Sequence, residues 1–365
     1  MTNRYQSCKQ IMPKFLWEHI IKALSADHLF KMHIVDKKFF IVANSGDLQQ
    51  LFIDNIKAKV IVIEGKSNRI KNFWLIAWYS HTFDDIPDAL RYIEKKNNTK
   101  PAYYKILLMN GEHAFRIKNN GTYTYSNSNI NIELSGIHKH AKSTIIEGDT
   151  LCYKHINITG CFFIKYVIFN HNSICVGTPK DKFSPASKVY VSNCGFNNKS
   201  LLEINSIANV NITHCIFDNS SMIFGNNTYG YFIGGGFVVT ENILKVNYIV
   251  AHNTFVNNKY IACFSFAGAY HKSSIINIVD NIISDSELLS IVYSSNATIR
   301  FRDNMIKKVV TCIRSHNDSA IIIFEDNIFD KVESLHKYHE IDKVLFEGYN
   351  EYSDCGENFM RFIME

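Results

Sequence analysis

Three aspartates are spaced so that they could act together in catalysis. Asp280, Asp303 and Asp326 follow one another at intervals of 23 residues, and each precedes an asparagine. If that interval is one turn of a repeat, the three carboxyl groups stack on one ladder. Close aspartates can serve as the acid and base of glycoside hydrolysis, and clustered carboxylates can hold calcium. Because an Asp beside an Asn also caps repeated corners, we interpret all three as structural.

The other candidates for chemistry are sparse. His138 and His140 could bind a metal, but no carboxylate or cysteine stands close to them in the sequence. The glycines at 234–236 lack the Lys-Ser/Thr of a phosphate-binding loop. Residues 116–118 reproduce the Arg-Ile-Lys triplet of polygalacturonases, but they precede the repeats. The Asn-x-Asp, Asp-Asp and Gly-His-Gly signatures of those enzymes are missing from the repeat region. The sequence therefore predicts no catalytic residues, no metal and no cofactor.

A repeat dominates the second half of the chain. In its first copy, Val189 and Val191 precede the polar anchor Asn193, and Phe196 follows it. The same spacing of apolar residues recurs around five later polar anchors, which are His214, His252, Asp280, Asp303 and Asp326. The intervals between anchors are 21, 38, 28, 23 and 23 residues. Alternation with a period of two predicts short strands, and a period in the low twenties predicts a solenoid.

A right-handed parallel β-helix fits this repeat better than a leucine-rich repeat, because regular leucines and helical returns are absent. A second apolar segment follows each of several anchors at 201–204, 260–263, 288–291 and 309–312. Polar corners such as 197–198, 218–219 and 257–258 suit the left-handed or bridge backbone of a tight turn. Their Asn and Asp side chains can also hydrogen-bond from coil to coil. The fold class predicted is mainly β.

A short helix is expected just before the coils. Asp84 or Asp85 is a candidate N-cap, and Pro87 falls in the first turn. One apolar face is formed by Ile86, Ala89, Leu90 and Ile93. This order, a helix followed by a strand and a glycine, resembles the start of pectate-lyase-like β-helix proteins, in which a helix covers the open end. We expect a capped β-helix over residues 83–350 and a C-terminal cap or tail over 351–365.

Residues 10–44 have a helical period and predict three short helices. Together with Pro13, the apolar positions resemble an F-box, with Met12 in place of the usual Leu and Asp36 in place of Cys. The matching positions are Pro13, Leu16, Ile20, Leu24, Leu29, Val35 and Phe39. The resemblance implies that these residues bind a Skp1-type adaptor. Three core helices packed on the solenoid are the alternative. Residues 45–82 are expected to link or dock the two parts, with a strand near 59–63.

Composition sets the broad class of protein. The chain has 365 residues, 46% of them hydrophobic, and a formal net charge of +5, which is ordinary for a folded protein and too weak to indicate nucleic-acid binding. No apolar run reaches the roughly 20 residues of a membrane span. The nine cysteines include no Cys-x-x-Cys pair, which favours reduced, buried thiols over disulfides or zinc. With no signal peptide apparent, we expect a cytoplasmic or nuclear protein that is not secreted.

The combined architecture resembles β-helix F-box-only proteins and the F-box proteins of giant DNA viruses. If the protein is viral, the cytoplasm or nucleus in question is that of the host cell. The resemblance implies a substrate-recognition subunit of a Skp1–cullin–F-box ubiquitin ligase, with the β-helix binding a target protein of unknown identity. Target contacts are expected at Tyr229, Tyr231 and Phe232, in an insertion between two repeats. The alternatives are a carbohydrate-active or carbohydrate-binding β-helix protein and a purely structural β-helix.

Overall fold

A computed structural model gives the structure of the protein. It describes most of the chain after residue 79 and one strand before it. The described ranges are 60–65, 80–96, 102–115, 122–126, 130–137, 144–148, 150–154, 161–172, 174–176, 184–205, 207–226, 247–258, 262–268, 273–294, 297–315, 320–336 and 343–364.

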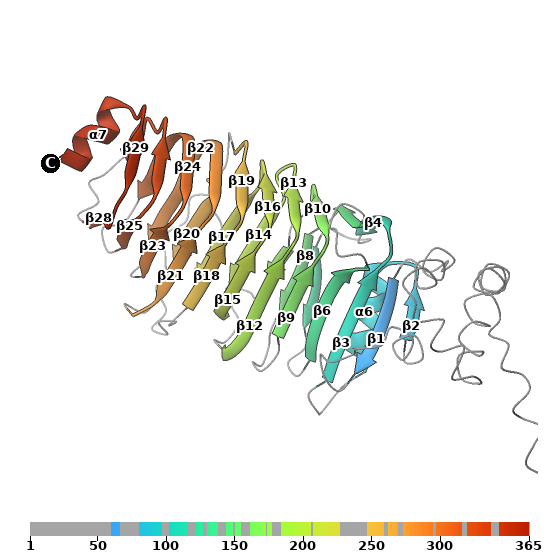
Figure 1. The fold of residues 1–365 in the computed structure, drawn as a ribbon. Helices are drawn as coiled ribbons and strands as arrows, with labels where there is room; N and C mark the ends of the chain where they lie inside the picture. Colours follow the sequence, from blue (N-terminus) through green and yellow to red (C-terminus); the bar gives the residue numbers. More distant parts are fainter. Residues whose placement is uncertain are drawn as a thin grey trace, which may run out of the picture.

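The chain winds into a β-solenoid whose coils contribute strands to two long sheets (Figure 1). The first sheet has 12 strands in the order β2-β1-β3-β6-β9-β12-β15-β18-β21-β23-β25-β28. Their bounds are β1 Val60–Gly65, β2 Ser80–Phe83, β3 Ala102–Leu108, β6 Ile130–Gly136, β9 Cys161–Lys165, β12 Ser184–Ser192, β15 Ile207–Thr213, β18 Asn247–Ala251, β21 Ile275–Val279, β23 Thr298–Arg302, β25 Ile321–Glu325 and β28 Val344–Glu347.

The second sheet has 17 strands, which come from the other side of each coil. Their bounds are β4 Gly111–Phe115, β5 Thr122–Ser126, β7 Thr144–Gly148, β8 Thr150–Lys154, β10 Ile168–Asn170, β11 Ile174–Val176, β13 Gly195–Asn197, β14 Leu201–Asn205, β16 Ile216–Asp218, β17 Ser221–Asn226, β19 Thr254–Val256, β20 Phe264–Gly268, β22 Ile282–Ser294, β24 Met305–Ser315, β26 Ile328–Asp330, β27 Ser334–His336 and β29 Glu351–Ser353.

The strand pairing confirms the predicted parallel β-helix. From β3 to β28 each strand of the first sheet pairs in parallel with the next strand, one coil further along the chain. The first two strands of the sheet depart from this order, because β1 pairs antiparallel with both β2 and β3. The sheet thus begins within residues 45–82, the predicted link. The right-handed sense of the coils stays a prediction.

The six polar anchors mark one sharp corner in each of six successive coils. Asn193, His214, His252, Asp280, Asp303 and Asp326 all have φ between 53° and 57°. This left-handed conformation is one that Asn, Asp and His adopt more readily than other residues with a side chain. The repeat therefore recurs because one backbone turn demands it. We call this turn the first corner.

The core consists of side-chain ladders that run along the solenoid axis. Phe169, Phe196, Phe217 and Phe255 stack in succession, with ring centroids 5.0, 4.6 and 4.7 Å apart. The predicted inward residues Phe217, Ile278, Phe301 and Phe324 are all 0% exposed, which confirms their assignment to the core. One expected second strand was displaced: residues 260–263 were predicted, but β20 begins at Phe264. Cys263, just before β20, hydrogen-bonds to Asn258 and Ser286 and so belongs to the turn between β19 and β20, which is not the first corner.

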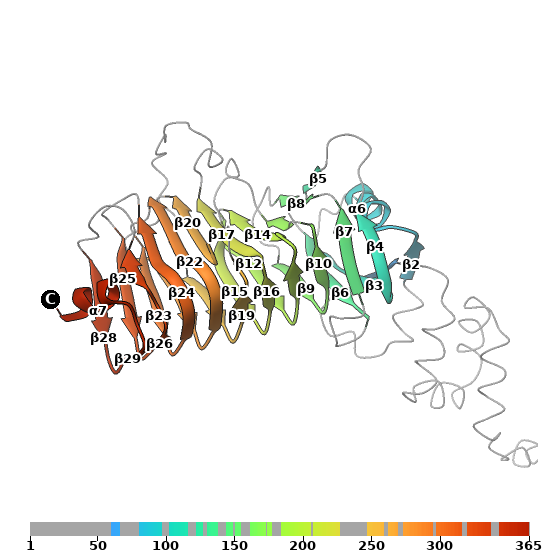
Figure 2. The same ribbon diagram turned by 90° about the horizontal axis from the view of Figure 1, so that it is seen from above.

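Two helices of the described chain cover the ends of the solenoid (Figure 2). Helix α6, Ile86–Lys95, has Asp85 as its N-cap, whose carboxylate accepts a hydrogen bond from the Asp88 N–H at 2.7 Å. It buries the predicted apolar face of Ile86, Ala89, Leu90 and Ile93, and Pro87 as well. Helix α7, Glu357–Met364, places Phe359 against Phe329 at the other end, with ring centroids 5.1 Å apart. The F-box-like residues 10–44 lie outside the described part of the chain.

Candidate binding surface at the first corner

A ladder of asparagines fills the inside of the first corner in the C-terminal coils. We call Asn253, Asn281, Asn304, Asn327 and Asn350 the asparagine ladder; the first four directly follow an anchor and are at most 1% exposed, and Asn350 bonds to Asn327 in the same way from the last coil. Each buried carboxamide bonds to the coils on both sides. The Asn304 Oδ1 accepts from the Asn281 N–H at 2.9 Å and from the Asn281 Nδ2 at 3.0 Å.

The other half of each carboxamide closes the ladder. Asn304 Nδ2 donates to the Ile278 carbonyl oxygen at 2.8 Å and to Asn327 Oδ1 at 3.0 Å. Asn327 repeats the pattern with the Phe301 carbonyl oxygen and with Asn350. An unpaired buried amide or carbonyl group costs roughly 1–3 kcal/mol, so this continuous pairing both permits the burial and ties successive coils together.

Cysteines take the same position in two earlier coils. Cys194 and Cys215 are 2% and 1% exposed, and their thiols donate to the Ser192 and Thr213 carbonyl oxygens two residues before them. Burial, with a further contribution from Cys194, raises the pKa of the Cys215 thiol. All six cysteines whose side chains the structure describes are free thiols, as predicted. The asparagine ladder begins where the Cys215 N–H donates to Asn253 Oδ1 at 2.8 Å.

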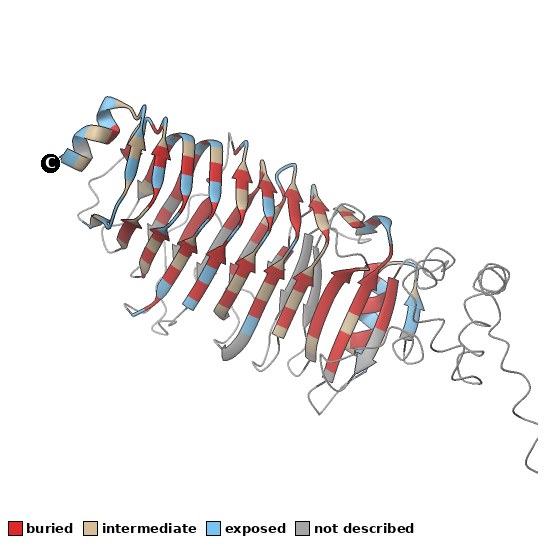
Figure 3. Ribbon diagram, in the orientation of Figure 1, coloured by how far each residue is buried: buried red, intermediate tan, exposed pale blue. Residues whose placement is uncertain are grey.

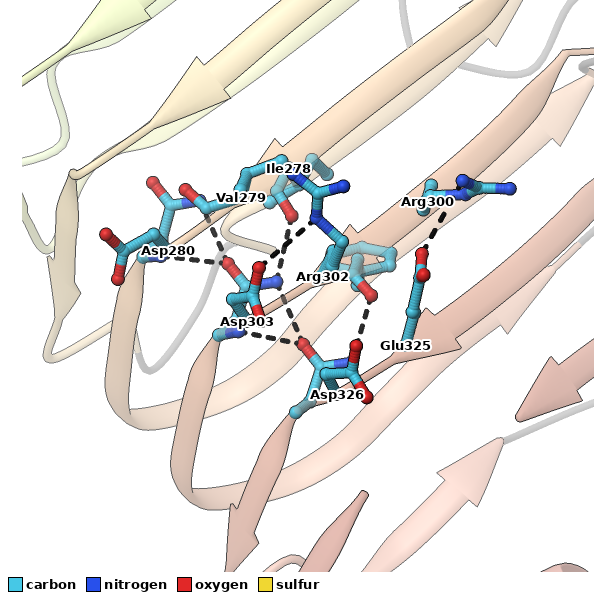
Figure 4. A network of polar contacts seen from close by, with 12 residues as sticks. Ile278, Val279, Asp280, Arg300, Arg302, Asp303, Glu325 and Asp326 are labelled. Atoms are coloured by element: carbon cyan, nitrogen blue, oxygen red, sulfur yellow. Dashed lines mark hydrogen bonds and ion pairs between the residues drawn. The ribbon is translucent and has the colours of Figure 1, made fainter. Parts of the chain in front are cut away.

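Outside the same corner, Asp280, Asp303 and Asp326 occupy successive coils (Figure 4). Asp280 Oδ2 lies 2.7 Å from His252 Nδ1, and Asp303 Oδ2 lies 3.2 Å from Arg302 Nε. Asp326 Oδ1 accepts from the Tyr349 N–H at 2.6 Å. The three aspartates thus form the predicted ladder, and each has a local partner that fits the structural interpretation. The described residues contain no cluster of three or more side chains suited to a metal.

Beside these anchors runs a row of exposed side chains, most of them apolar. We call Ile216, Thr254, Ile282, Met305 and Ile328 the apolar row; each is the second residue after its anchor, and they are in register on strands β16, β19, β22, β24 and β26 of the second sheet. The four apolar members are 52%, 48%, 42% and 39% exposed, respectively. Their neighbours one residue later point into the core. The sequence signal was an apolar residue two positions after most anchors, where alternation would place a polar one.

A buried polar cluster lies on the outward side of the first sheet, far from the corner. Glu133 on β6 is 8% exposed and accepts a hydrogen bond from the Tyr103 hydroxyl on β3. Its carboxylate also lies 3.0 Å from Lys105 Nζ and 3.8 Å from Lys165 Nζ. Burial alone would raise the pKa of Glu133, but Lys105, Tyr103 and Lys165 outweigh burial and hold that pKa below its ordinary value. The sequence analysis missed this cluster.

Burial and the interaction with Glu133 raise the pKa of Tyr103 well above its ordinary value. The outward neighbours Ile61, Leu107 and Ser135 are also buried, at 5%, 6% and 3% exposed. In the later coils, Ile275 and Leu345 are outward positions that are 46% and 47% exposed, although the outward Ile323 is 6% exposed. The outward side of the first sheet is therefore buried along its first strands and more exposed at several positions further along (Figure 3).

Most of the predicted site residues lie outside the part of the chain that the structure describes. The F-box-like positions Pro13, Leu16, Ile20, Leu24, Leu29, Val35 and Phe39 lie outside the described residues, as do Tyr229, Tyr231 and Phe232. The same holds for His138, His140 and residues 116–118. Within the part of the chain that is described, neither helix is long and apolar enough to cross a membrane.

Comparisons with known proteins add little to this geometry. No protein-family model matches the chain, and no curated protein is similar to it. Among solved structures, the chain is similar to tailspike protein 3 of bacteriophage CBA120, at 10% identity and a TM-score of 0.25. The match covers 80% of this chain and 60% of the tailspike chain. The β-solenoid assignment rests on the strand pairing described above.

Proposed function

We propose that the protein is a substrate-recognition subunit of a Skp1–cullin–F-box ubiquitin ligase. Residues 10–44 bind the Skp1-type adaptor, and the β-helix binds the protein to be modified. The adaptor half of the proposal is supported by the F-box resemblance of residues 12–39. In this role the ubiquitin-transfer chemistry belongs to partner subunits, and the chain itself supplies two binding surfaces.

The observation that carries the recruiting role is the apolar row beside the first corner. Ile216, Ile282, Met305 and Ile328 are held in register on a hydrogen-bonded scaffold and are 39–52% exposed. Isolated exposed apolar residues are common on proteins, but contiguous ones mark interaction sites. Tyr229, Tyr231 and Phe232 remain a proposed second contact. They fall in the insertion between β17 and β18, and insertions in a solenoid project from its corners.

Adaptor binding tests the ligase assignment. Full-length protein and its Ile20→Asp variant are titrated with a purified Skp1-type adaptor by isothermal calorimetry. Truncating an interface anchor costs on the order of 2 kcal/mol, so Ile20→Asp should weaken binding by roughly thirtyfold or more. Lys22→Asp is the matched control, because it places the same carboxylate on the opposite side of the predicted helix. Circular dichroism melts of all three proteins should coincide, because the F-box-like residues 10–44 precede the strands of the solenoid in the sequence.

Two results would contradict the proposal. Wild-type protein that binds no Skp1-type adaptor removes the ligase assignment. Equal losses in Ile20→Asp and Lys22→Asp would show that binding does not use the predicted helical face.

A further inference from the structure

The apolar row has the length and width needed to contact one α-helix. Its five members are neighbours in consecutive parallel pairs from Ile216 to Ile328, and the next coil ends the row with Glu351. Adjacent strands lie about 4.8 Å apart, so the row is about 19 Å long and one side chain wide. An α-helix rises 1.5 Å per residue, so about 13 residues, nearly four turns, would cover it.

The fold does not require apolar side chains in this row. The core is filled by the following residue of each strand, including Phe217, Ile283 and Phe329, which are 0% exposed. The outward position two residues later shows what the same strands tolerate. There Lys307 and Asp330 form an ion pair, with Nζ and Oδ2 3.2 Å apart. Because a polar side chain would fit the row equally well, its exposed isoleucines are better explained by a partner.

The two sides of the row differ in charge. Asp280, Asp303 and Asp326 flank it at the first corner, and the side chains of Asp280 and Asp303 are 62% and 52% exposed. This edge also carries the positively charged Arg302, which pairs with Asp303, and His252, which pairs with Asp280. On the far side, the Lys307–Asp330 and Lys308–Asp285 pairs are neutral, and Asp218 accepts a hydrogen bond from Asn257 Nδ2. The row therefore has an acidic edge along the first corner.

Building on the proposed function, we infer that the apolar row and its acidic edge form the docking site for a basic amphipathic α-helix of the target protein. One apolar stripe of the helix lies on Ile216, Ile282, Met305 and Ile328. The 5.4 Å pitch of a helix is close to the spacing of the coils, so one apolar side chain per turn meets about one member of the row. Lys or Arg side chains beside that stripe reach the carboxylates of Asp280, Asp303 and Asp326.

An extended peptide fits less well. A segment laid along the row runs across the strands of the solenoid, so it cannot add to either sheet by backbone hydrogen bonds. Its side chains on one face would also be about 7 Å apart, out of step with the coils. A helix satisfies its own backbone and needs only the side-chain contacts that this surface offers.

The test uses a fluorescein-labelled peptide of about 13 residues, helical by design, with one leucine stripe flanked by lysines. Its control peptide has glutamate at every lysine. Full-length protein is titrated against both by fluorescence anisotropy. The basic peptide should bind saturably, with affinity that falls as salt is added, and the acidic peptide should not.

Protein variants locate the site. Ile282→Ser combined with Ile328→Ser should weaken binding by about tenfold or more. Ile275→Ser is the matched control: Ile275 is 46% exposed, close to the 48% of Ile282, but it lies on the first sheet and away from the row. Asp280→Asn with Asp326→Asn should weaken binding several-fold and flatten its salt dependence. Asn is compatible with this backbone, because Asn193 has the same φ in an earlier coil.

Several outcomes would overturn the inference. They are equal affinity for the two peptides, equal losses in the Ile282 and Ile275 variants, or no binding of the basic peptide. Self-association of the wild type that disappears in the Ile282 and Ile328 variant would assign the row to a second copy of the chain. Adaptor binding separates the two proposals. The row variant should retain it, so peptide failure with intact adaptor binding defeats only the helix-docking inference.

Discussion

The first corner is built in two ways along the solenoid. The backbone is the same in both regions, with φ of 54° at Asn193 and 55° at Asp303. Inside the corner, the thiols of Cys194 and Cys215 donate to carbonyl oxygens of their own coils, and Cys194 also contributes to the raised pKa of Cys215 in the next coil. The asparagines from Asn253 onward instead hydrogen-bond across coils with both the oxygen and the nitrogen of the carboxamide. The turn therefore does not depend on asparagine. What asparagine adds is a connection from each coil to the next.

The outward surfaces of the two ends also differ. The first strands bury Glu133, Tyr103 and their neighbours on the outward side, whereas the asparagine-lined coils expose most of the apolar row. The first strands of the solenoid thus bury their outward side chains, and the later coils carry a regular row of exposed ones on cross-linked corners.

Core truncation should have the largest effect, and it should occur in both regions. Phe301→Ala in the asparagine-lined coils should cost about 3–5 kcal/mol, and Ile212→Ala in the cysteine-lined coils about 2–5 kcal/mol, because each leaves a cavity in a continuous ladder. Urea unfolding followed by circular dichroism measures both values. A cost for Phe301→Ala no greater than that of the exposed substitution Ile275→Ser would show that the ladder does not support the fold.

The pH dependence of stability should belong to the first strands. The pKa of Glu133 is lowered in the folded protein, so its stabilising contribution is present above the ordinary carboxyl pKa and is lost as pH falls through the folded value. Tyr103 has the opposite sign. Its raised pKa gives a contribution that is present below the ordinary tyrosine value and is lost as pH rises.

Glu133→Gln should therefore flatten the acid side of the stability profile, as measured by urea midpoints from neutral to acid pH. Ile275→Ser is the control, since Ile275 is exposed on a later coil and carries no titratable group, so the acid side of its stability profile should run parallel to that of the wild type. A Glu133→Gln protein that loses stability in acid as steeply as the wild type would contradict the assigned role of the cluster.

The sequence predicted the repeated elements well because their signals are local. Alternation placed Phe301 and Phe324 inside, the polar anchors predicted the corner, and Asp85 with Pro87 predicted the start of α6. The Glu133 cluster could not be predicted in this way. Its members come from β3, β6 and β9, which are far apart in the sequence. The repeat is less regular there than in the later coils, so the spacing does not predict which residues of these strands are neighbours. The apolar row has a sequence pattern, because its residues recur two positions after the anchors. The sequence alone does not distinguish an exposed isoleucine from a buried one, so the backbone was needed to show that the row is exposed.

The asparagine ladder is the central element of this account, because it connects the coils that carry the proposed docking surface. The direct test compares Asn304→Ala with Cys194→Ala, the same truncation in each of the two regions. Asn304→Ala leaves the Asn281 N–H and the Ile278 carbonyl without the partners that they have now, so it should cost about 3 kcal/mol. Cys194→Ala removes a small side chain and a weak donor and should cost about 1 kcal/mol.

Hydrogen exchange read by mass spectrometry localises these changes in the full chain. We expect Asn304→Ala to accelerate exchange of the Asn281 amide and its neighbours in both adjoining coils, and Cys194→Ala to act mainly within its own coil, where its thiol bonds to the Ser192 carbonyl oxygen. Equal costs for the two variants, with exchange confined to the mutated coil in both, would show that the asparagines do not couple the coils and would contradict the account.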